Sequence, residues 1–139
     1  MFLGEYQHSI DTKGRVAMPA RFRSKIANGV ALVKGVENCL YVFPIEVWEK
    51  MAEDLDYLQV SAEQRRLIER RFFGTAYESE LDTQGRIIIP AGFRSYASLT
   101  KEVAVIGARR RIELWGAAQW NSYQNEIAAL DLTGVPLPF

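Results

Sequence analysis

The sequence contains an internal repeat, which limits the possible folds more than any other feature. Residues 11–24 and 82–95 are identical at nine of fourteen positions. With one residue inserted in the second copy, the match continues along the chain and places Trp48 on Trp120. Self-similarity at a fixed spacing is typical of a duplicated structural unit. The sequence therefore predicts two copies of one unit, at residues 3–58 and 74–130. A connector at 59–73 joins them, and a tail follows at 131–139.

Both copies are expected to have the same order of short strands and helices. Alternating residues predict a first strand, and the sequence Asp-Thr-Lys-Gly or Asp-Thr-Gln-Gly after it predicts a tight turn. A second strand leads into a proline that suits the first turn of a helix, and two more strands precede a closing helix. The expected strands are 5–10, 15–18, 31–34, 39–43, 76–81, 86–89, 103–106 and 111–115. The expected helices are 19–26, 45–55, 90–97 and 120–130.

The connector is expected to be a helix, because Ser61 and Gln64 have the spacing of a capping box. Its arginines have two interpretations: a solvated or partner-docking face, which is favoured, and a surface that contacts nucleic acid. The tail contains two prolines and is expected to be loosely held. The arginines of the connector are Arg65, Arg66, Arg70 and Arg71.

The two copies are expected to share one hydrophobic core. A unit of about 56 residues with four short strands is only marginally stable alone. Interleaving two such units would close a small barrel and remove exposed strand edges. The predicted fold class is therefore α+β: a tandem-duplicated, swapped-hairpin β-barrel, or intrachain pseudo-dimer, with flanking helices. Trp48, in the closing helix of the first copy, is assigned to the core.

The rarest residue types exclude several kinds of chemistry. Cys39 is the single cysteine and His8 the single histidine, so the chain can form neither an intrachain disulfide nor a Cys/His zinc site. A hydrolytic triad would need His8 as its base, and His8 is interpreted instead as a partly exposed strand residue. The sequence contains no apolar run of the roughly 18 residues that a membrane helix needs, and its start lacks the features of a signal peptide. The expected location is the cytoplasm.

Charge is balanced overall but segregated along the chain. The sequence has 17 basic and 17 acidic residues, which gives a formal net charge of zero. Residues 11–25 carry five basic side chains and one acidic one, whereas residues 37–56 carry six acidic side chains and one basic one. A neutral protein with this distribution can present a local positive patch. The composition is therefore compatible with a nucleic-acid partner.

The two predicted turns carry the most specific signal. Each begins with Asp, continues to a glycine that suits positive φ, and places an arginine directly after that glycine. A guanidinium oriented by the Asp would suit phosphate oxygens or a guanine edge. The alternative is an Asp–Arg pair that only staples the turn. Basic residues near the turns are Lys13, Arg21, Arg23 and Lys25 in the first copy, and Arg94 and Lys101 in the second.

The first copy is expected to bind polyanions better than the second, because Gln84 and Gly92 stand where the first copy has Lys13 and Arg21.

Two other clusters have weaker functional interpretations. The acidic residues Glu78, Glu80 and Asp82 share one strand face and could form a metal or acid–base site, although an exposed face paired with nearby arginines is favoured. The basic loop at residues 109–111 is either solvated or a binding surface, with no preference between the two.

Several motifs together resemble the MraZ family of bacterial proteins. They are the start Met-Phe-x-Gly-Glu-Tyr, the two Asp-Thr-x-Gly-Arg turns, Arg-Arg-Phe-Phe-Gly at 70–74 and Glu-Leu-Trp at 113–115. The resemblance covers nearly the whole chain and implies two AbrB-like swapped-hairpin halves that assemble into ring-like oligomers. It also implies a transcriptional regulator that binds short direct repeats in the promoter of the division and cell-wall gene cluster. The Asp-x-x-x-Arg residues that would face the DNA are Asp11, Arg15, Asp82 and Arg86.

We therefore expect a DNA-binding regulator, cytoplasmic and nucleoid-associated, and not an enzyme. Its partners would be double-stranded DNA and further copies of the chain, with no membrane, small-molecule substrate, metal or cofactor. Two rival classes are a protein-interaction module, like the DNA-binding antidotes of toxin pairs, and a carboxylate enzyme that uses Glu78 and Glu80. The predicted DNA-binding residues are Asp11, Lys13, Arg15, Arg21, Arg23, Asp82, Arg86 and Arg94.

Overall fold

The computed structural model describes residues 1–139, and its two halves contain the same series of elements. The first half comprises β1 (Phe2–Ser9), β2 (Arg15–Ala17), α1 (Ala20–Arg23), η1 (Ser24–Ile26), β3 (Val30–Lys34), β4 (Leu40–Pro44), α2 (Ile45–Asp54) and η2 (Leu55–Tyr57). The connector forms α3 (Ala62–Ile68) and η3 (Glu69–Phe73). The second half comprises β5 (Tyr77–Ser79), β6 (Arg86–Ile88), α4 (Ala91–Ala97), β7 (Glu102–Arg109), β8 (Arg111–Gly116) and α5 (Ala117–Ala128). Every expected strand and helix is confirmed, although β5 is shorter than predicted.

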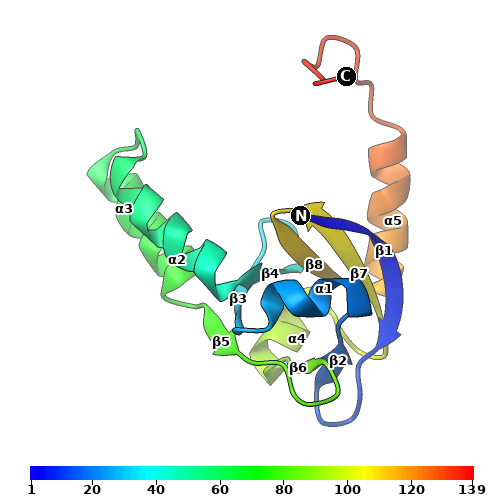
Figure 1. The fold of residues 1–139 in the computed structure, drawn as a ribbon. Coiled ribbons are helices and arrows are strands. Elements are labelled where there is room, and N and C mark those ends of the chain that lie inside the picture. Colours follow the sequence, from blue (N-terminus) through cyan, green and yellow to red (C-terminus); the bar gives the residue numbers. More distant parts are fainter.

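Six strands form one antiparallel sheet in which the two halves exchange edge strands (Figure 1). The strand order is β1-β7-β8-β4-β3-β5. The first-half strand β1 pairs with the second-half strand β7 over its whole length, from Phe2↔Arg109 to Ser9↔Glu102. The second-half strand β5 pairs in turn with β3, while β4 and β8 meet at the centre. The two halves are therefore interleaved, and neither can form this sheet alone.

The strands that follow the two predicted turns pair with each other in a separate two-stranded ribbon, β2–β6. Reciprocal backbone bonds extend this ribbon. The Met18 N–H donates to the Gly85 carbonyl at 2.9 Å, and the Ile89 N–H donates to the Gly14 carbonyl at 2.7 Å. This pattern relates the halves by a local pseudo-twofold axis, and both turns lie at the end of the molecule opposite the termini (Figure 1).

The sheet is open, so the expected closure into a barrel does not occur. Its outer strands, β1 and β5, do not pair with each other. β5 has only three residues, all paired with β3, and β1 is paired throughout with β7. The core is closed instead by the β2–β6 ribbon, α1 and α4. A cluster of 19 buried residues from both halves joins these elements to the sheet, and it includes Val16, Phe22, Ile87 and Phe93.

The closing helix of the first half packs outside this core, which corrects the assignment of Trp48. Trp48 is half-buried and stacks between two rings, with centroid distances of 5.2 Å to Phe43 and 4.4 Å to Phe73. The connector is the physical reason. Its capping box forms as predicted between Ser61 and Gln64, and the helix that it begins returns along α2. The two helices project together from the sheet (Figure 1).

Two of the four connector arginines attach the connector to the rest of the molecule. Arg65 donates to the carbonyl oxygens of Leu55, at the start of η2, and Leu58, just after its end. Arg71 donates to the hydroxyl of Tyr96 in α4 at 3.1 Å. Arg66, Arg70 and Arg71 are exposed, whereas Arg65 is half-buried. The interpretation of all four as a solvated or docking face is therefore wrong for Arg65 alone, because Arg71 makes its bonds within the fold from an exposed position.

The chain leaves the sheet through α5 and ends in a segment without regular structure. Trp120 of α5 packs on Trp115 with ring centroids 5.4 Å apart, which anchors the start of this helix. Its later residues and the tail are exposed, in agreement with the expected loose tail. None of the helices combines the length and apolar character that a membrane crossing requires.

Candidate nucleic-acid interface

The first turn is organised by one carboxylate. Asp11 Oδ1 accepts hydrogen bonds from the backbone N–H groups of Lys13 and Arg15, both at 2.9 Å. Its Oδ2 accepts from Arg15 Nε at 2.7 Å. Gly14 has a φ of +79°, a conformation that disfavours other residues. The aspartate therefore fixes both the backbone of the turn and the direction of its guanidinium, as the sequence predicted.

The second turn repeats this geometry. Asp82 accepts from the backbone N–H groups of Gln84 and Arg86 at 2.9 Å, and from Arg86 Nε at 2.8 Å. Gly85 has a φ of +76°. The change from lysine in the first turn to Gln84 in the second leaves this network intact, because the bond at this position uses the backbone. The two turns thus share one conformation but present different side chains.

The pseudo-twofold axis brings the two arginines to one surface. Arg86 Nη1 lies 3.9 Å from Asp11 Oδ2, so a charge of the second turn approaches the carboxylate of the first. The side chains of Arg15 and Arg86 are 30% and 24% exposed. Each uses its Nε on its own aspartate, which leaves terminal guanidinium N–H groups available to a ligand. Two oriented guanidinium groups therefore lie side by side on an accessible surface.

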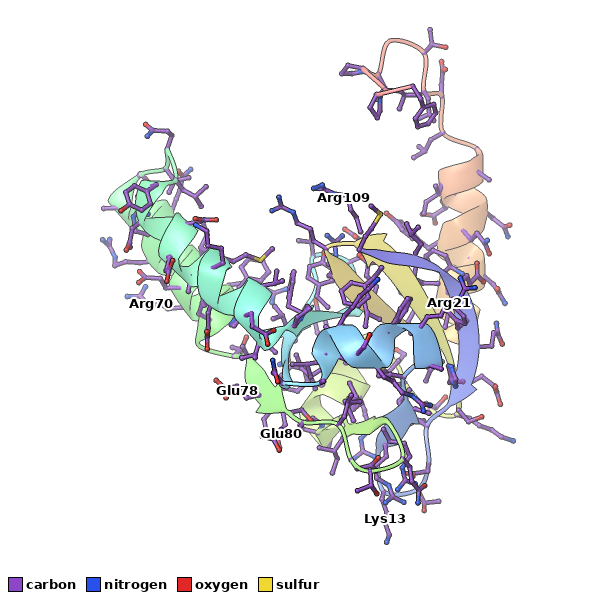
Figure 2. The ribbon with its side chains drawn as sticks, viewed as in Figure 1. Lys13, Arg21, Arg70, Glu78, Glu80 and Arg109 are labelled. Carbon is purple, nitrogen blue, oxygen red and sulfur yellow. The ribbon has the colours of Figure 1, made fainter.

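The remaining predicted residues divide into three groups. Lys13 is exposed at the tip of the first turn (Figure 2). Arg21 in α1 is also exposed, but it lies beside β1, away from the tip (Figure 2). Arg23 and Arg94 are half-buried, each against the glycine of the other half's turn. The structure therefore gathers all of these residues around the two turns except Arg21.

Comparison with known proteins identifies what this duplicated chain is related to. It matches the family described as "MraZ protein, putative antitoxin-like" over residues 1–71 and again over 72–135. The chain belongs to the MraZ family. The protein named "Transcriptional regulator MraZ" from Heliobacterium modesticaldum is 46% identical over 93% of this chain and 90% of its own length. Proteins of the same name from Finegoldia magna and Alkaliphilus metalliredigens are 44% and 46% identical over 91% of this chain and 88% of their lengths.

Both turn carboxyls of this MraZ family member are held in the ionised form. The backbone N–H of Arg15 is the main cause that lowers the pKa of Asp11; partial desolvation opposes it, and the Arg15 side chain adds to it. Arg86 lowers the pKa of Asp82 in the same way. Because the folded-state pKa is depressed, each carboxylate stays paired with its arginine at any pH above the ordinary pKa of Asp. The pair is lost only as the pH falls through the lowered pKa.

The interpretation of the sequence missed two hydroxyl groups beside this MraZ surface. Thr12 and Thr83 are exposed at equivalent positions of the two turns. A hydroxyl can donate to a phosphate oxygen as a basic side chain can. The signal that could have found them was their identity in both copies, since the backbone bonds of the turn do not require threonine.

The two alternative sites are the acidic residues before the second turn and the basic loop at residues 109–111. Glu78 in β5 and Glu80 just after it are exposed (Figure 2). Of the three acidic residues expected to pair with arginines, Asp82 alone does so, with Arg86. No group of three or more His, Cys, Asp and Glu side chains is arranged to hold a metal ion. Arg109, in the basic loop, lies at the opposite end of the molecule from Lys13 (Figure 2). The acidic residues therefore offer no metal site, and the basic loop is separate from the surface formed by the turns.

Proposed function

We propose that this chain is a DNA-binding transcriptional regulator that recognises direct repeats in the promoter of the division and cell-wall gene cluster. The observation that carries the proposal is the pair of guanidinium groups, Arg15 and Arg86, that two aspartates orient on one accessible surface. Relatives named as transcriptional regulators, at 44–46% identity over most of the chain, support it. In this proposal the units 3–58 and 74–130 are the AbrB-like swapped-hairpin repeats, and the protein acts at the nucleoid without enzymatic activity.

Arginine chemistry explains how such a surface would hold DNA. The planar guanidinium pairs with two phosphate oxygens or with the O6 and N7 atoms of guanine. A fork that is already oriented loses less side-chain entropy when it binds. Lys13 adds a phosphate contact in the first turn only. The proposed DNA-binding surface comprises Asp11, Lys13, Arg15, Arg21, Arg23, Asp82, Arg86 and Arg94. Arg21 is a peripheral phosphate contact, and Arg23 and Arg94 lie half-buried beneath the surface, against the turns.

We also propose that the chain works as a ring-like homo-oligomer. In the first half, the connector covers α2, and the Phe73 ring stacks on Trp48. In the second half, the equivalent helix α5 has no such cover, so Ile127 and Leu130 are exposed, and so is Leu132 in the tail. A second copy can bury these apolar side chains. Several chains on repeated sites would raise affinity through effective concentration, since the few cations of one chain bind weakly.

A binding titration at several salt concentrations tests the proposed function. The purified chain is expected to bind a promoter duplex from its own division gene cluster more tightly than a duplex of scrambled repeats. The logarithm of the affinity should fall linearly with the logarithm of the salt concentration, and each neutralised phosphate should add about 0.9 to the steepness of the slope. Equal affinity for both duplexes, or no binding at low salt, would reject sequence-specific DNA recognition by this protein.

The two turn aspartates are expected to differ in their effect on DNA binding. Asp11 Oδ2 lies 2.7 Å from Arg15 Nε and 3.9 Å from Arg86 Nη1, whereas Asp82 pairs with Arg86 alone. Asp11→Asn should therefore free Arg15 and also remove the second, longer ion pair of Arg86, which weakens promoter binding by about tenfold, with a smaller loss for Asp82→Asn. Fluorescence anisotropy at fixed salt measures both. A larger loss for Asp82→Asn would contradict the shared role of Asp11.

A further inference from the structure

Two equivalent arginines each contact the opposite half of the molecule. Arg23 in α1 and Arg94 in α4 occupy the same position in the two repeats. Each lies against the turn of the other half, where it occupies space that a glycine leaves free. The sequence suggests phosphate contacts for both, but their half-buried position against a backbone turn indicates a different task.

Arg23 contacts the second turn closely. A Cβ atom placed on Gly85 would collide with Arg23 Nε and lie 2.8 Å from its Cδ, so the arginine covers the bare face of this glycine. Arg23 Nε also donates to the Met18 carbonyl at 2.9 Å. The N–H of the same Met18 donates to the Gly85 carbonyl at 2.9 Å. Arg23 therefore ties together the end of β2 and the turn that begins the partner strand β6.

Arg94 has the equivalent place on the first turn, with a looser attachment. A Cβ atom on Gly14 would lie 3.0 Å from Arg94 Nη1 and 3.0 Å from the Ile89 carbonyl oxygen. The Ile89 N–H donates to the Gly14 carbonyl at 2.7 Å, which repeats the arrangement around Arg23. Arg94 Nε, however, is buried without a hydrogen-bond partner. The first turn is thus braced by packing against Arg94, whereas the arginine that packs on the second turn is itself held by a hydrogen bond to Met18.

We propose that Arg23 and Arg94 are crossed positioning residues, each of which holds the DNA-facing turn of the opposite half in its binding conformation. The proposal rests on the function proposed above. Arg94 acts on the turn at 11–15 and hence on Arg15, while Arg23 acts on the turn at 82–86 and hence on Arg86. A residue of one half therefore sets how well the other half binds DNA.

Double-mutant cycles on promoter binding test the direction of this coupling. Arg15→Lys and Arg86→Lys remove one oriented fork each but keep the charge, so binding at low salt stays measurable. Arg94→Ala is expected to weaken binding about tenfold in the unmodified protein and in Arg86→Lys, but less than about twofold in Arg15→Lys. Arg23→Ala should show the reverse pattern. Equal effects in both backgrounds would mean independent phosphate contacts and would overturn the proposal.

Amide hydrogen exchange on the DNA-free protein tests the bracing itself. The peptide around residues 11–15 contains N–H groups that bond to Asp11, and the peptide around 82–86 contains the equivalent groups bonded to Asp82. Arg94→Ala should speed exchange in the first peptide and Arg23→Ala in the second. Faster exchange in the mutated residue's own half, or equally in both turns, would overturn the crossed assignment.

The two measurements separate failure of this inference from failure of the proposed function. If Arg15→Lys and Arg86→Lys leave promoter binding unchanged, the DNA-binding surface is wrong, yet the exchange pattern still decides whether the arginines brace the turns. Arg70→Ala is the matched control, because Arg70 is an exposed arginine on the connector, away from the turns (Figure 2). Arg70→Ala should leave hydrogen exchange unchanged in the peptides of both turns. Arg23→Met and Arg94→Met, which keep most of the side-chain volume, replace any alanine variant that lowers the melting temperature.

Discussion

Replacement of Arg15 by alanine is expected to abolish promoter binding at moderate salt while the oligomer stays intact. The loss of one oriented fork removes about 1–3 kcal/mol of base or phosphate interaction from each chain. Because several chains bind together, this loss is multiplied across the assembly. The fold should be unaffected, since the Arg15 side chain is part of an accessible ion pair with Asp11, and such pairs contribute little stability.

A gel-shift titration together with size-exclusion chromatography measures both parts of this expectation. Arg70→Ala removes the same charge from an exposed site on the connector and should leave binding within about twofold of the unmodified protein. Unchanged promoter binding by Arg15→Ala would show that the turns do not face DNA. Loss of the oligomer in the same variant would assign Arg15 to a subunit contact instead.

Ile87→Ala is expected to destabilise the whole protein. Ile87 is fully buried in β6, pairs with Val16 of β2, and belongs to the core that both halves share. Removal of its side chain should lower the free energy of unfolding by about 2–5 kcal/mol, a large part of the about 5–15 kcal/mol of a typical domain. Because β6 follows the second turn directly and pairs with β2, which follows the first turn, DNA binding should weaken as well.

The neighbouring residue provides a matched control. Ile88 lies on the same strand with 46% of its surface exposed, and Ile88→Ala should change the free energy of unfolding by less than about 0.5 kcal/mol. Urea denaturation at one fixed protein concentration compares the two variants, because oligomerisation makes apparent stability depend on concentration. Equal losses for Ile87→Ala and Ile88→Ala would contradict the placement of the shared core.

Local features of this fold could be predicted from the sequence because their interactions span few residues. The bond from Arg15 to Asp11 closes over four positions, and the capping box at Ser61 over three. Both are determined by the identity of neighbours along the chain. The repeat added a check, since the same turn had to form twice in one molecule.

Features that depend on partners far apart in the chain were not predictable in the same way. The pairing of β1 with β7 joins residues about a hundred positions apart, and no local pattern indicates its register. The barrel was expected to close because nothing in the sequence shows that β5 would have only three paired residues. Trp48 was assigned to the core by helical spacing, which identifies an apolar face but not the connector that covers it.

The same distinction applies to the candidate site. Lys13 and both Asp–Arg pairs followed from the spacing of each turn. The contact of Arg23 with Gly85 did not, because it exists only once the halves are interleaved. Arg21 belongs to the same short helix as Arg23, yet it lies away from the tips, because its direction depends on how α1 packs.

The pseudo-twofold axis has a consequence for how DNA can be read. A dimer of identical subunits presents the same tip twice and so matches palindromic half-sites. Here both tips belong to one polypeptide, and one carries Lys13 where the other carries Gln84. In the proposed function, the DNA-binding surface would therefore have polarity: it would distinguish the two directions along a duplex, and successive subunits in the same orientation would favour operator copies arranged head to tail.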